Sequence, residues 1–437
     1  MRALVALSLA ASLALLSACD WGGTQPPVQV SPTPSPTWVP PIGDTTSGRY
    51  SHSGIEVHGG GLYVQVKDAA GKAVKGARLK LYGPTLVSVE TNDSGEATLG
   101  PLAVGSGYRL VVEADGYATN QQGNIEIKKS EVSAQRPNLS RGASLSGRVL
   151  AGGQPVAGAV VSDGLNSALT DASGSYTLGG VAPGPITLSA SKSRFRTASR
   201  QLEVASQGAT AIDLALEGAE PVAYFDGTVT SGVSPAKLSA LQGYLRGRGW
   251  TLSSQPPARE GVWVLVSPSQ APSPDTIGRI TNFVAQGGKL VIFGEWGGFS
   301  GFHNPGANAL AHQVGLHFNP DLVRVPGASP DAPTIRNFQP GQSALSDVKT
   351  VQLYSTSSLF ALAPMAALAQ TGAEAFRVQA NAAVGAKEVV MGGPYKAGKA
   401  IALGDTSAWL DEDSDGDGVA NAEEADNLAL AGAVFDW

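Results

Sequence analysis

Hydrophobic and polar residues alternate in short runs through residues 59–218, for example at 62–66 (LYVQV) and 145–149 (LSGRV). Turn-forming residues separate these runs at intervals of about 8–12 positions. A period of two places successive side chains on opposite faces of a strand, so each strand can bury one face. The pattern therefore predicts small antiparallel β-sandwiches over this part of the chain.

The β region contains an internal repeat. Residues 72–77 (KAVKGA) match residues 154–159 (QPVAGA), and residues 91–95 (TNDSG) match residues 170–174 (TDASG). The second pair predicts a turn, because Asn, Asp and Gly tolerate the left-handed backbone of a tight reversal. We therefore expect two β-sandwich domains, at residues 59–140 and 141–219.

After residue 220 the pattern changes to continuous apolar runs separated by helix signals. Strands buried on both faces are predicted at 222–225 (VAYF), 262–266 (VWVLV), 290–293 (LVIF), 388–391 and 400–403. Ser-Pro helix-start signals and apolar periodicity predict helices at 234–245, 277–285 and about 421–435. Alternating strands and helices predict an α/β domain with a mainly parallel sheet, over residues 220–437.

The N-terminus carries an export signal. Arg2 precedes an apolar stretch that ends at Leu16, and two small residues lead to Cys19, the only cysteine. The stretch is too short to span a membrane, and residues 1–18 fit a secretory signal peptide. With Cys19 at the junction, it resembles the lipobox of bacterial lipoproteins; an ordinary signal with a chance cysteine is the alternative. The resemblance implies an exported protein, anchored by lipid at Cys19 to the cell membrane or outer membrane and facing outside the cytoplasm.

Residues 19–58 are expected to form a lipidated, Pro-rich linker. Seven prolines fall between positions 26 and 41, where they favour an extended chain. The formal net charge is −6, and loss of Arg2 with the signal makes it −7, which argues against a nucleic-acid partner. With its one thiol carrying lipid, the mature chain is expected to have no internal disulfide, cysteine nucleophile or thiolate metal site.

Both β segments resemble the carboxypeptidase regulatory-like, or transthyretin-like, β-sandwich family. The second copy carries the resemblance in residues 147–149 (GRV), 156–159 (VAGA), 170–176 (TDASGSY) and 181–184 (VAPG). The resemblance implies spacer or adhesion modules. Some relatives share a carbohydrate-binding-like fold, so carbohydrate or cell-wall binding through these domains is an alternative function.

The last domain resembles the class I glutamine-amidotransferase-like fold, closest to its non-catalytic branch. Residues 280–294 (ITNFVAQGGKLVIFG), 308–310 and 404–405 carry the resemblance. In active members the turn after the strand equivalent to 290–293 holds a nucleophilic cysteine, whereas here it holds Glu295. An acid–base pair of Glu295 with His303, in a hydrolase- or amidotransferase-like enzyme, is the catalytic alternative. The missing nucleophile favours a non-enzymatic domain.

Residues 413–424 (DSDGDGVANAEE) fit a complete calcium-loop pattern. The predicted ligands are Asp413, Asp415, Asp417, Val419 through its carbonyl, Asn421 and Glu424. The loop resembles an EF-hand or dockerin-like calcium loop, although a strand and a loop rather than a helix precede it. A solvated acidic loop is the alternative. We expect a structural Ca²⁺ site that orders the loop and starts the last helix.

Taken together, the sequence predicts a surface-anchored, non-enzymatic lipoprotein that presents a calcium-stabilised α/β domain for binding or cell-envelope assembly. The expected partners are the membrane, through the anchor at Cys19, and a protein or cell-wall polysaccharide.

Overall fold

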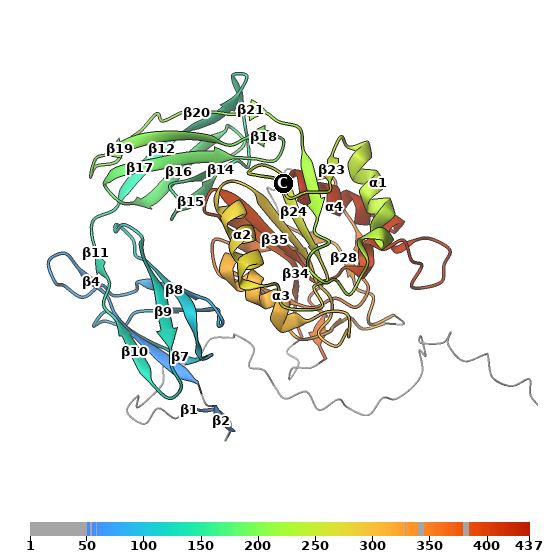
Figure 1. Ribbon diagram of the computed structural model, residues 1–437, viewed down its shortest axis with the longest axis horizontal. Coiled ribbons are helices and arrows are strands. Elements are labelled where there is room, and N and C mark those ends of the chain that lie inside the picture. The colour runs from blue at the N-terminus through green and yellow to red at the C-terminus, as the bar shows by residue number, and fades with distance from the viewer. Residues whose placement is uncertain (1–49, 53–54, 58, 328, 340–344, 379–383) are drawn as a thin grey trace, which may run out of the picture. The chain divides into compact units, whose positions relative to one another are not determined.

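The computed structural model describes residues 50–437, apart from 53–54, 58, 328, 340–344 and 379–383 (Figure 1). Within these residues the chain forms two β-sandwich domains, followed by an α/β domain with a mainly parallel sheet. The predicted fold class is therefore confirmed. The signal peptide, Cys19 and most of the Pro-rich linker lie outside the described residues, and the predictions for them stand as predictions.

The first β-sandwich domain contains a three-stranded and a four-stranded sheet. The three-stranded sheet has the order β10 (Val132–Gln135), β3 (Gly60–Gln65), β7 (Glu96–Leu102). The four-stranded sheet has the order β6 (Val87–Glu90), β5 (Arg78–Tyr82), β8 (Gly105–Glu113), β9 (Asn120–Ile127). Two further pairs are β1 (Tyr50–His52) with β2 (Ile55–Val57) and β4 (Lys67–Asp68) with β11 (Asn138–Leu139).

The core of this domain forms between the inner faces of its two sheets. In β8, Tyr108, Leu110 and Val112 are buried, and the residues between them are partly exposed. They belong to one apolar cluster with Leu62 and Val64 of β3. Burial along β8 therefore alternates with the period of two that the sequence predicts. Pairing is mostly antiparallel, but β10 runs parallel to β3 and β11 runs parallel to β4.

The second β-sandwich domain has two four-stranded sheets. One contains β13 (Gln154–Pro155), β12 (Ala143–Ala151) and β16 (Ser175–Val181), with β20 (Leu214–Ala215) beside β12. The other has the order β15 (Ser167–Leu169), β14 (Val160–Ser162), β17 (Gly184–Ser191), β19 (Ala198–Val204). A short pair joins β18 (Phe195–Arg196) and β21 (Glu217–Gly218).

The sequence repeat corresponds to a repeated hydrogen-bond pattern. The Thr91 hydroxyl accepts from the Ala77 N–H (2.9 Å) and donates to the Val74 carbonyl (2.7 Å). In the second copy, the hydroxyl of Thr170 accepts from Ala159 (2.8 Å) and donates to Val156 (2.6 Å). A buried threonine thus secures the same turn in both domains, which explains why this residue recurs.

The α/β domain is built on an eight-stranded sheet. Its order is β23 (Thr251–Ser253), β22 (Val222–Phe225), β24 (Val262–Val266), β25 (Lys289–Phe293), β35 (Gly398–Leu403), β34 (Glu388–Tyr395), β32 (Ala366–Gln370), β29 (Asn337–Phe338). The first five strands are parallel and the last three pair antiparallel. Short pairs join β26 (Leu316–Phe318) to β31 (Leu359–Ala361), β27 (Val323–Arg324) to β33 (Phe376–Arg377) and β28 (Thr334–Ile335) to β30 (Val351–Gln352).

Helices cover both faces of this sheet (Figure 1). They are η1 (Pro235–Leu238), α1 (Ser239–Gly247), α2 (Pro274–Ala285), α3 (Asn304–Ala311), η2 (His312–Val314), η4 (Ser407–Trp409), η5 (Asn421–Glu423) and α4 (Asn427–Asp436). Val264 of β24 packs in the cluster that contains α1 and α4, and Trp263 packs in the cluster that contains α2 and α3. None of the helices in the described part of the chain has the length and apolar character needed to cross a membrane.

The last helix differs from its prediction. Residues 421–423 form only the short turn η5, and α4 begins at Asn427. The break falls at Ala425, whose φ of 43° lies in the left-handed region and cannot continue a right-handed helix. The acidic loop therefore leads into a separate turn rather than into the helix itself.

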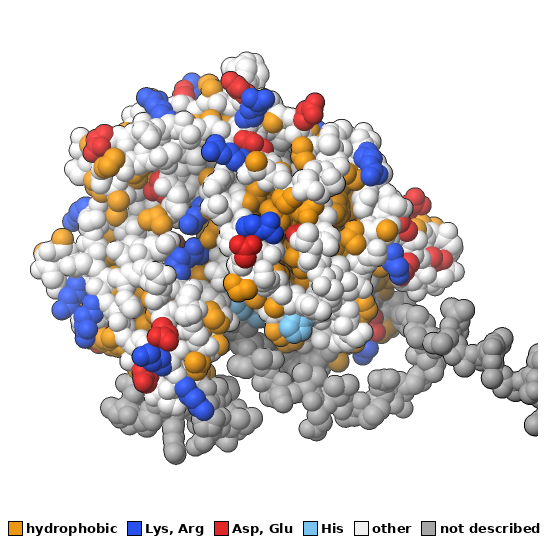
Figure 2. All heavy atoms as spheres, in the orientation of Figure 1, with side chains coloured by type: hydrophobic (Ala, Val, Ile, Leu, Met, Phe, Trp, Pro, Cys, Tyr) orange, Lys and Arg blue, Asp and Glu red, His pale blue; other side chains and the backbone are white. Residues whose placement is uncertain are grey.

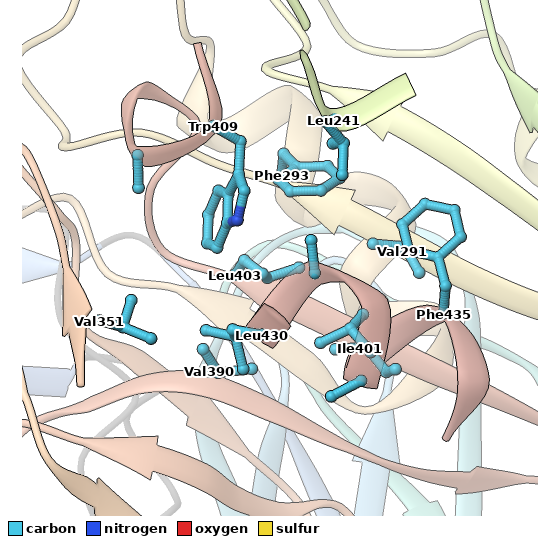
Figure 3. Packing of buried hydrophobic residues seen from close by; sticks show 14 of the residues in the cluster. Leu241, Val291, Phe293, Val351, Val390, Ile401, Leu403, Trp409, Leu430 and Phe435 are labelled. Carbon is cyan, nitrogen blue, oxygen red and sulfur yellow. The ribbon is translucent and has the colours of Figure 1, made fainter. Parts of the chain in front are cut away.

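The indole of Trp409 belongs to the larger apolar cluster of the α/β domain. It is fully buried, meets the Phe293 ring edge-on at a centroid distance of 5.2 Å, and lies close to Leu403 and Leu430 (Figure 3). Its Nε1–H donates to the carbonyl of Asn427 (2.7 Å). This contact joins the turn η4 to the start of α4.

We expect Trp409→Ala to lower the free energy of unfolding of the α/β domain by about 3–5 kcal/mol, because it leaves a cavity in a close-packed core. Urea denaturation followed by circular dichroism measures the change. Val104→Ala, at a side chain that is 51 % exposed, is the control and should stay within about 0.5 kcal/mol of wild type. A loss as small as the control's would contradict a central role for the indole.

Candidate metal loop and the carboxylate pair beside it

The acidic segment 411–424 follows η4, includes η5 near its end, and is attached to the domain at both ends. At its start, the Asp411 carboxylate accepts the N–H groups of Ser239 and Ala240, each at 2.8 Å, and so caps the first turn of α1. At its end, the Asn421 N–H donates to the Glu412 carbonyl (2.7 Å). The loop itself projects into solvent, and acidic side chains gather at the right-hand edge of Figure 2, where it lies.

Three exposed aspartates of this loop lie together. Asp413, Asp415 and Asp417 each offer a carboxylate oxygen within 4.8 Å of the others. Both oxygens of Asp413 accept backbone N–H groups, from Gly416 (2.7 Å) and from Gly418 (2.9 Å). These hydrogen bonds, with that from Gly418 the strongest, lower the pKa of Asp413 and keep it ionised. This triad could hold a metal ion.

Glu424 approaches the triad from the far end of the loop. Burial, and then the charges of Asp417 and Asp415, raise the pKa of Glu424. Carboxylates in contact repel one another unless a proton or a cation lies between them. The donors are all oxygens, the set that Ca²⁺ prefers, so these residues fit a hard cation.

The other two predicted ligands, Asn421 and Val419, differ from the carboxylates in their surroundings. Asn421 is fully buried: its amide donates to the Ser407 carbonyl (2.8 Å) and to the Ser414 hydroxyl (2.7 Å), and its Oδ1 accepts the Ser414 N–H (2.9 Å). Asn421 therefore holds the loop in shape. Val419 lies at the exposed tip, where its N–H donates to Asp417 (2.8 Å).

A buried carboxylate pair lies at the carboxyl ends of the neighbouring strands β25 and β35. Glu295 is 2 % exposed and Asp405 is 1 % exposed. One oxygen of Glu295 accepts the N–H (3.0 Å) and the hydroxyl (2.8 Å) of Ser407, and the same N–H donates to Asp405 (2.6 Å). The remaining oxygen of Asp405 accepts the Tyr354 N–H (2.5 Å).

Burial raises the pKa values of both carboxyl groups. The pKa of Asp405 rises to about 7 despite its backbone hydrogen bonds. The pKa of Glu295 rises well above its usual range through burial and then through the charge of Asp405. Two titrating carboxyls this close share their protons as a pair, a property also seen at catalytic sites.

His303 is not part of this pair. It is exposed and precedes α3, and no hydrogen bond or ion pair in the described residues joins it to Glu295. The partner that the structure gives Glu295 is Ser407, which the sequence did not single out. A hydroxyl two residues after an aspartate is too common a pattern to reveal such a contact.

A cavity of about 630 Å³ lies elsewhere, and its lining includes Tyr82, Tyr117 and Tyr395, with Arg109 and Asn166. The sequence does not reveal these tyrosines as a group, because they come from segments far apart in the chain. Arg109 lies over the Tyr82 ring (4.6 Å) and donates to the Tyr395 hydroxyl (2.9 Å). Aromatic faces beside planar polar groups are features that suit polar ligands.

The fold and these sites define a chain of two β-sandwich domains and an α/β domain with a carboxylate pair at its strand ends. Residues 61–140 and 144–217 match the family model of the carboxypeptidase regulatory-like domain. Residues 231–429 match the model of a domain of unknown function, DUF4350. The chain therefore carries two carboxypeptidase regulatory-like β domains followed by a DUF4350 domain. No curated protein sequence matches it.

Several solved structures are weakly similar. The N-terminal domain of mmIFT52 is 16 % identical with a TM-score of 0.39, over 49 % of this chain and 96 % of that one. Cytoplasmic protein STM1381 from Salmonella typhimurium LT2 is 15 % identical with a TM-score of 0.30, over 42 % and 87 %. The Bacillus anthracis TIE protein is 16 % identical with a TM-score of 0.19, over 40 % and 37 %. Likenesses this weak carry no functional argument.

Glu295→Gln tests the electrostatics of the pair. A carboxyl whose pKa is higher in the folded state holds its proton more tightly there, so stability falls as pH rises from the unfolded towards the folded pKa. The amide removes this titration and keeps an acceptor for Ser407. We expect the variant to gain stability over wild type as pH rises from about 4 to about 8, by an amount of order 1 kcal/mol.

Urea denaturation at several pH values in that window measures this difference. Glu131→Gln, at an exposed position, is the control and should show the same difference from wild type at every pH. A pH-independent effect of Glu295→Gln would mean that the carboxyl does not titrate with folding.

Proposed function

We propose that this protein is an exported, lipid-anchored lipoprotein that presents its α/β domain for binding or cell-envelope assembly, and that Ca²⁺ in the 413–424 loop stabilises that domain. The observation that carries the proposal is the attachment of the acidic loop to the domain core. Asp411 caps α1, Asn421 bonds η4, and η4 in turn bonds α4 through Trp409. A cation held by this loop would therefore secure three core elements together.

The chemistry of the compartment supports calcium. Outside the cytoplasm, calcium is abundant enough for sites with dissociation constants of roughly 10⁻⁴–10⁻³ M to be filled. Asp413, Asp415, Asp417 and Glu424 supply oxygen donors, and Gly416 and Gly418 have positive φ values of 79° and 94° that allow the tight loop. The same loop as a merely solvated surface would hold the like charges of Asp413, Asp415 and Asp417 together without a cation.

The strand-end site fits a non-enzymatic domain that is presented for binding better than it fits a hydrolase. The position of the amidotransferase nucleophile holds Glu295, which is buried and engaged by Ser407. The raised pKa values of Glu295 and Asp405 are the feature that a catalytic alternative would use. That alternative would rest on these two carboxyls, since His303 lies apart from them.

Carbohydrate binding is the second candidate function. The cavity lined by Tyr117, Tyr395, Arg109 and Asn166 is the observation that favours it. Sugars are bound by aromatic faces together with planar polar side chains, and this lining offers both. A cell-wall polysaccharide is the corresponding partner.

Calcium binding is tested by calorimetric titration of the chelator-stripped full chain in detergent. We expect heat of binding with a dissociation constant at or below about 1 mM, and a higher melting temperature with calcium present. Asp415→Ala and Glu424→Ala should abolish both effects. Asp275→Ala, an exposed acidic residue on α2, should leave them unchanged. Flat heats with an unchanged melting temperature would eliminate the calcium site.

Anchoring is tested by Cys19→Ser. A lipid chain binds membranes through its buried CH₂ groups, at about 0.8 kcal/mol each, so its loss should release the protein from the membrane fraction. Ser17→Ala keeps a small residue before the junction and should leave the protein on the membrane. Fractionation followed by intact-mass measurement distinguishes the two variants, and a membrane-bound Cys19→Ser protein would contradict the anchor.

A further inference from the structure

A buried tyrosine beside the acidic loop lacks a hydrogen-bond partner. Tyr354 follows β30 and is 7 % exposed, and its Oη is inaccessible to solvent and unpaired within the described part of the chain. Burying a hydroxyl without a partner costs free energy, so such atoms are rare in native structures. The Trp409 indole in the same cluster is paired, with the Asn427 carbonyl. Like Trp250 Nε1 of the same cluster, the unpaired Tyr354 hydroxyl therefore needs a physical reason.

The segment before Tyr354 is bonded to the residues that follow Glu424. The Asp426 carboxylate accepts the N–H groups of Lys349 (2.8 Å) and Thr350 (3.0 Å), and Asn427 Oδ1 accepts the Gln352 N–H (2.9 Å). After burial, the strongest influences on the pKa of Tyr354 are the charges of Glu424, Asp415 and Asp417, which all raise it. The phenol thus keeps its proton and can act only as a neutral donor or acceptor. The backbone N–H of Tyr354 donates to Asp405 (2.5 Å), so the residue is held between the carboxylate pair and the acidic loop.

The loop offers a matching acceptor. Oε1 of Glu424 is also inaccessible to solvent and has no hydrogen-bond partner among the described residues. Tyr354 thus has a hydroxyl donor without an acceptor, and Glu424 has a carboxylate acceptor without a donor. The charge of Glu424 also raises the pKa of Tyr354. Glu424 is the predicted last ligand of the loop, and metal ligands are commonly oriented by a hydrogen bond from a residue behind them.

We propose that Tyr354 is a positioning residue of the metal site: with a cation in the loop, its hydroxyl donates to the Glu424 carboxylate and aims it at the ion. The metal site then includes Tyr354, which lies 70 positions before the last ligand, Glu424, in the sequence. This inference rests on the proposed calcium site. It adds that calcium joins the loop to the segment that holds Asp405, and so to the strand ends of the sheet.

Tyr354→Phe separates this role from ordinary packing. The substitution removes only the unpaired hydroxyl and keeps the ring in the core. In metal-free protein we expect a melting temperature equal to or above that of wild type, because an unsatisfied buried group is removed. With calcium, we expect the dissociation constant to rise roughly tenfold to a hundredfold, the usual effect of losing a hydrogen bond that orients a metal ligand.

The measurements are calorimetric calcium titration of the full chain in detergent and melting curves with and without calcium. Luminescence of bound Tb³⁺, excited through nearby aromatic rings, gives a separate readout of how Glu424 holds the ion. Tyr224→Phe is the matched control: it removes another buried hydroxyl of the same domain, one that donates to Asp226 (3.2 Å), and should not change calcium affinity.

The outcomes are distinct. Weaker calcium binding in Tyr354→Phe alone, with metal-free stability preserved, supports the proposal. Unchanged calcium affinity in Tyr354→Phe, with binding abolished in Glu424→Ala, overturns it and leaves the calcium site intact. A drop in metal-free stability with no change in affinity shows a purely structural tyrosine and also overturns it. Absence of calcium binding by the wild type removes the proposed site and this inference together.

Discussion

Two buried asparagine side chains hold the acidic loop, and the arrangement of its carboxylates depends on them. Asn421 bonds the loop to η4, and Asn427 bonds Gln352, Ala408 and Asn421 through one fully buried amide. Buried amides with all their partners present are rigid, because breaking any one of these hydrogen bonds leaves a polar group unpaired. The C-terminal end of the loop is therefore fixed, and a proton or a bound cation can neutralise the repulsion among its carboxylates.

The same turn connects the loop to the strand ends. Ser407 donates to both Glu295 and Asp405, and its carbonyl accepts from Asn421. The parallel strands β25 and β35 end side by side, so their following residues must share the few donors available there. Glu295 is part of this hydrogen-bonded network. The network joins the acidic loop and the carboxylate pair into one polar region at the carboxyl ends of these two strands.

Strong local patterns predicted most of the fold. Continuous apolar runs such as 262–266 and 290–293 became central parallel strands, and the alternating runs before residue 219 became sandwich strands. The Ser-Pro start signal of α2 was confirmed: Ser273 is its cap and Pro274 is its first residue. The break before α4 was missed, because one alanine with a positive φ leaves no mark in composition or period.

The sequence by itself determined the two β repeats, the α/β class and the spacing of Asp413, Asp415 and Asp417, since each depends on neighbours a few residues apart. Only the tertiary structure decided what surrounds the candidate sites. It gave Glu295 the partner Ser407 instead of His303, turned Asn421 into the core, and placed Tyr354 behind the acidic loop. These contacts join residues between 7 and 112 positions apart. Their formation depends on the order of strands in the sheet, which no local pattern encodes.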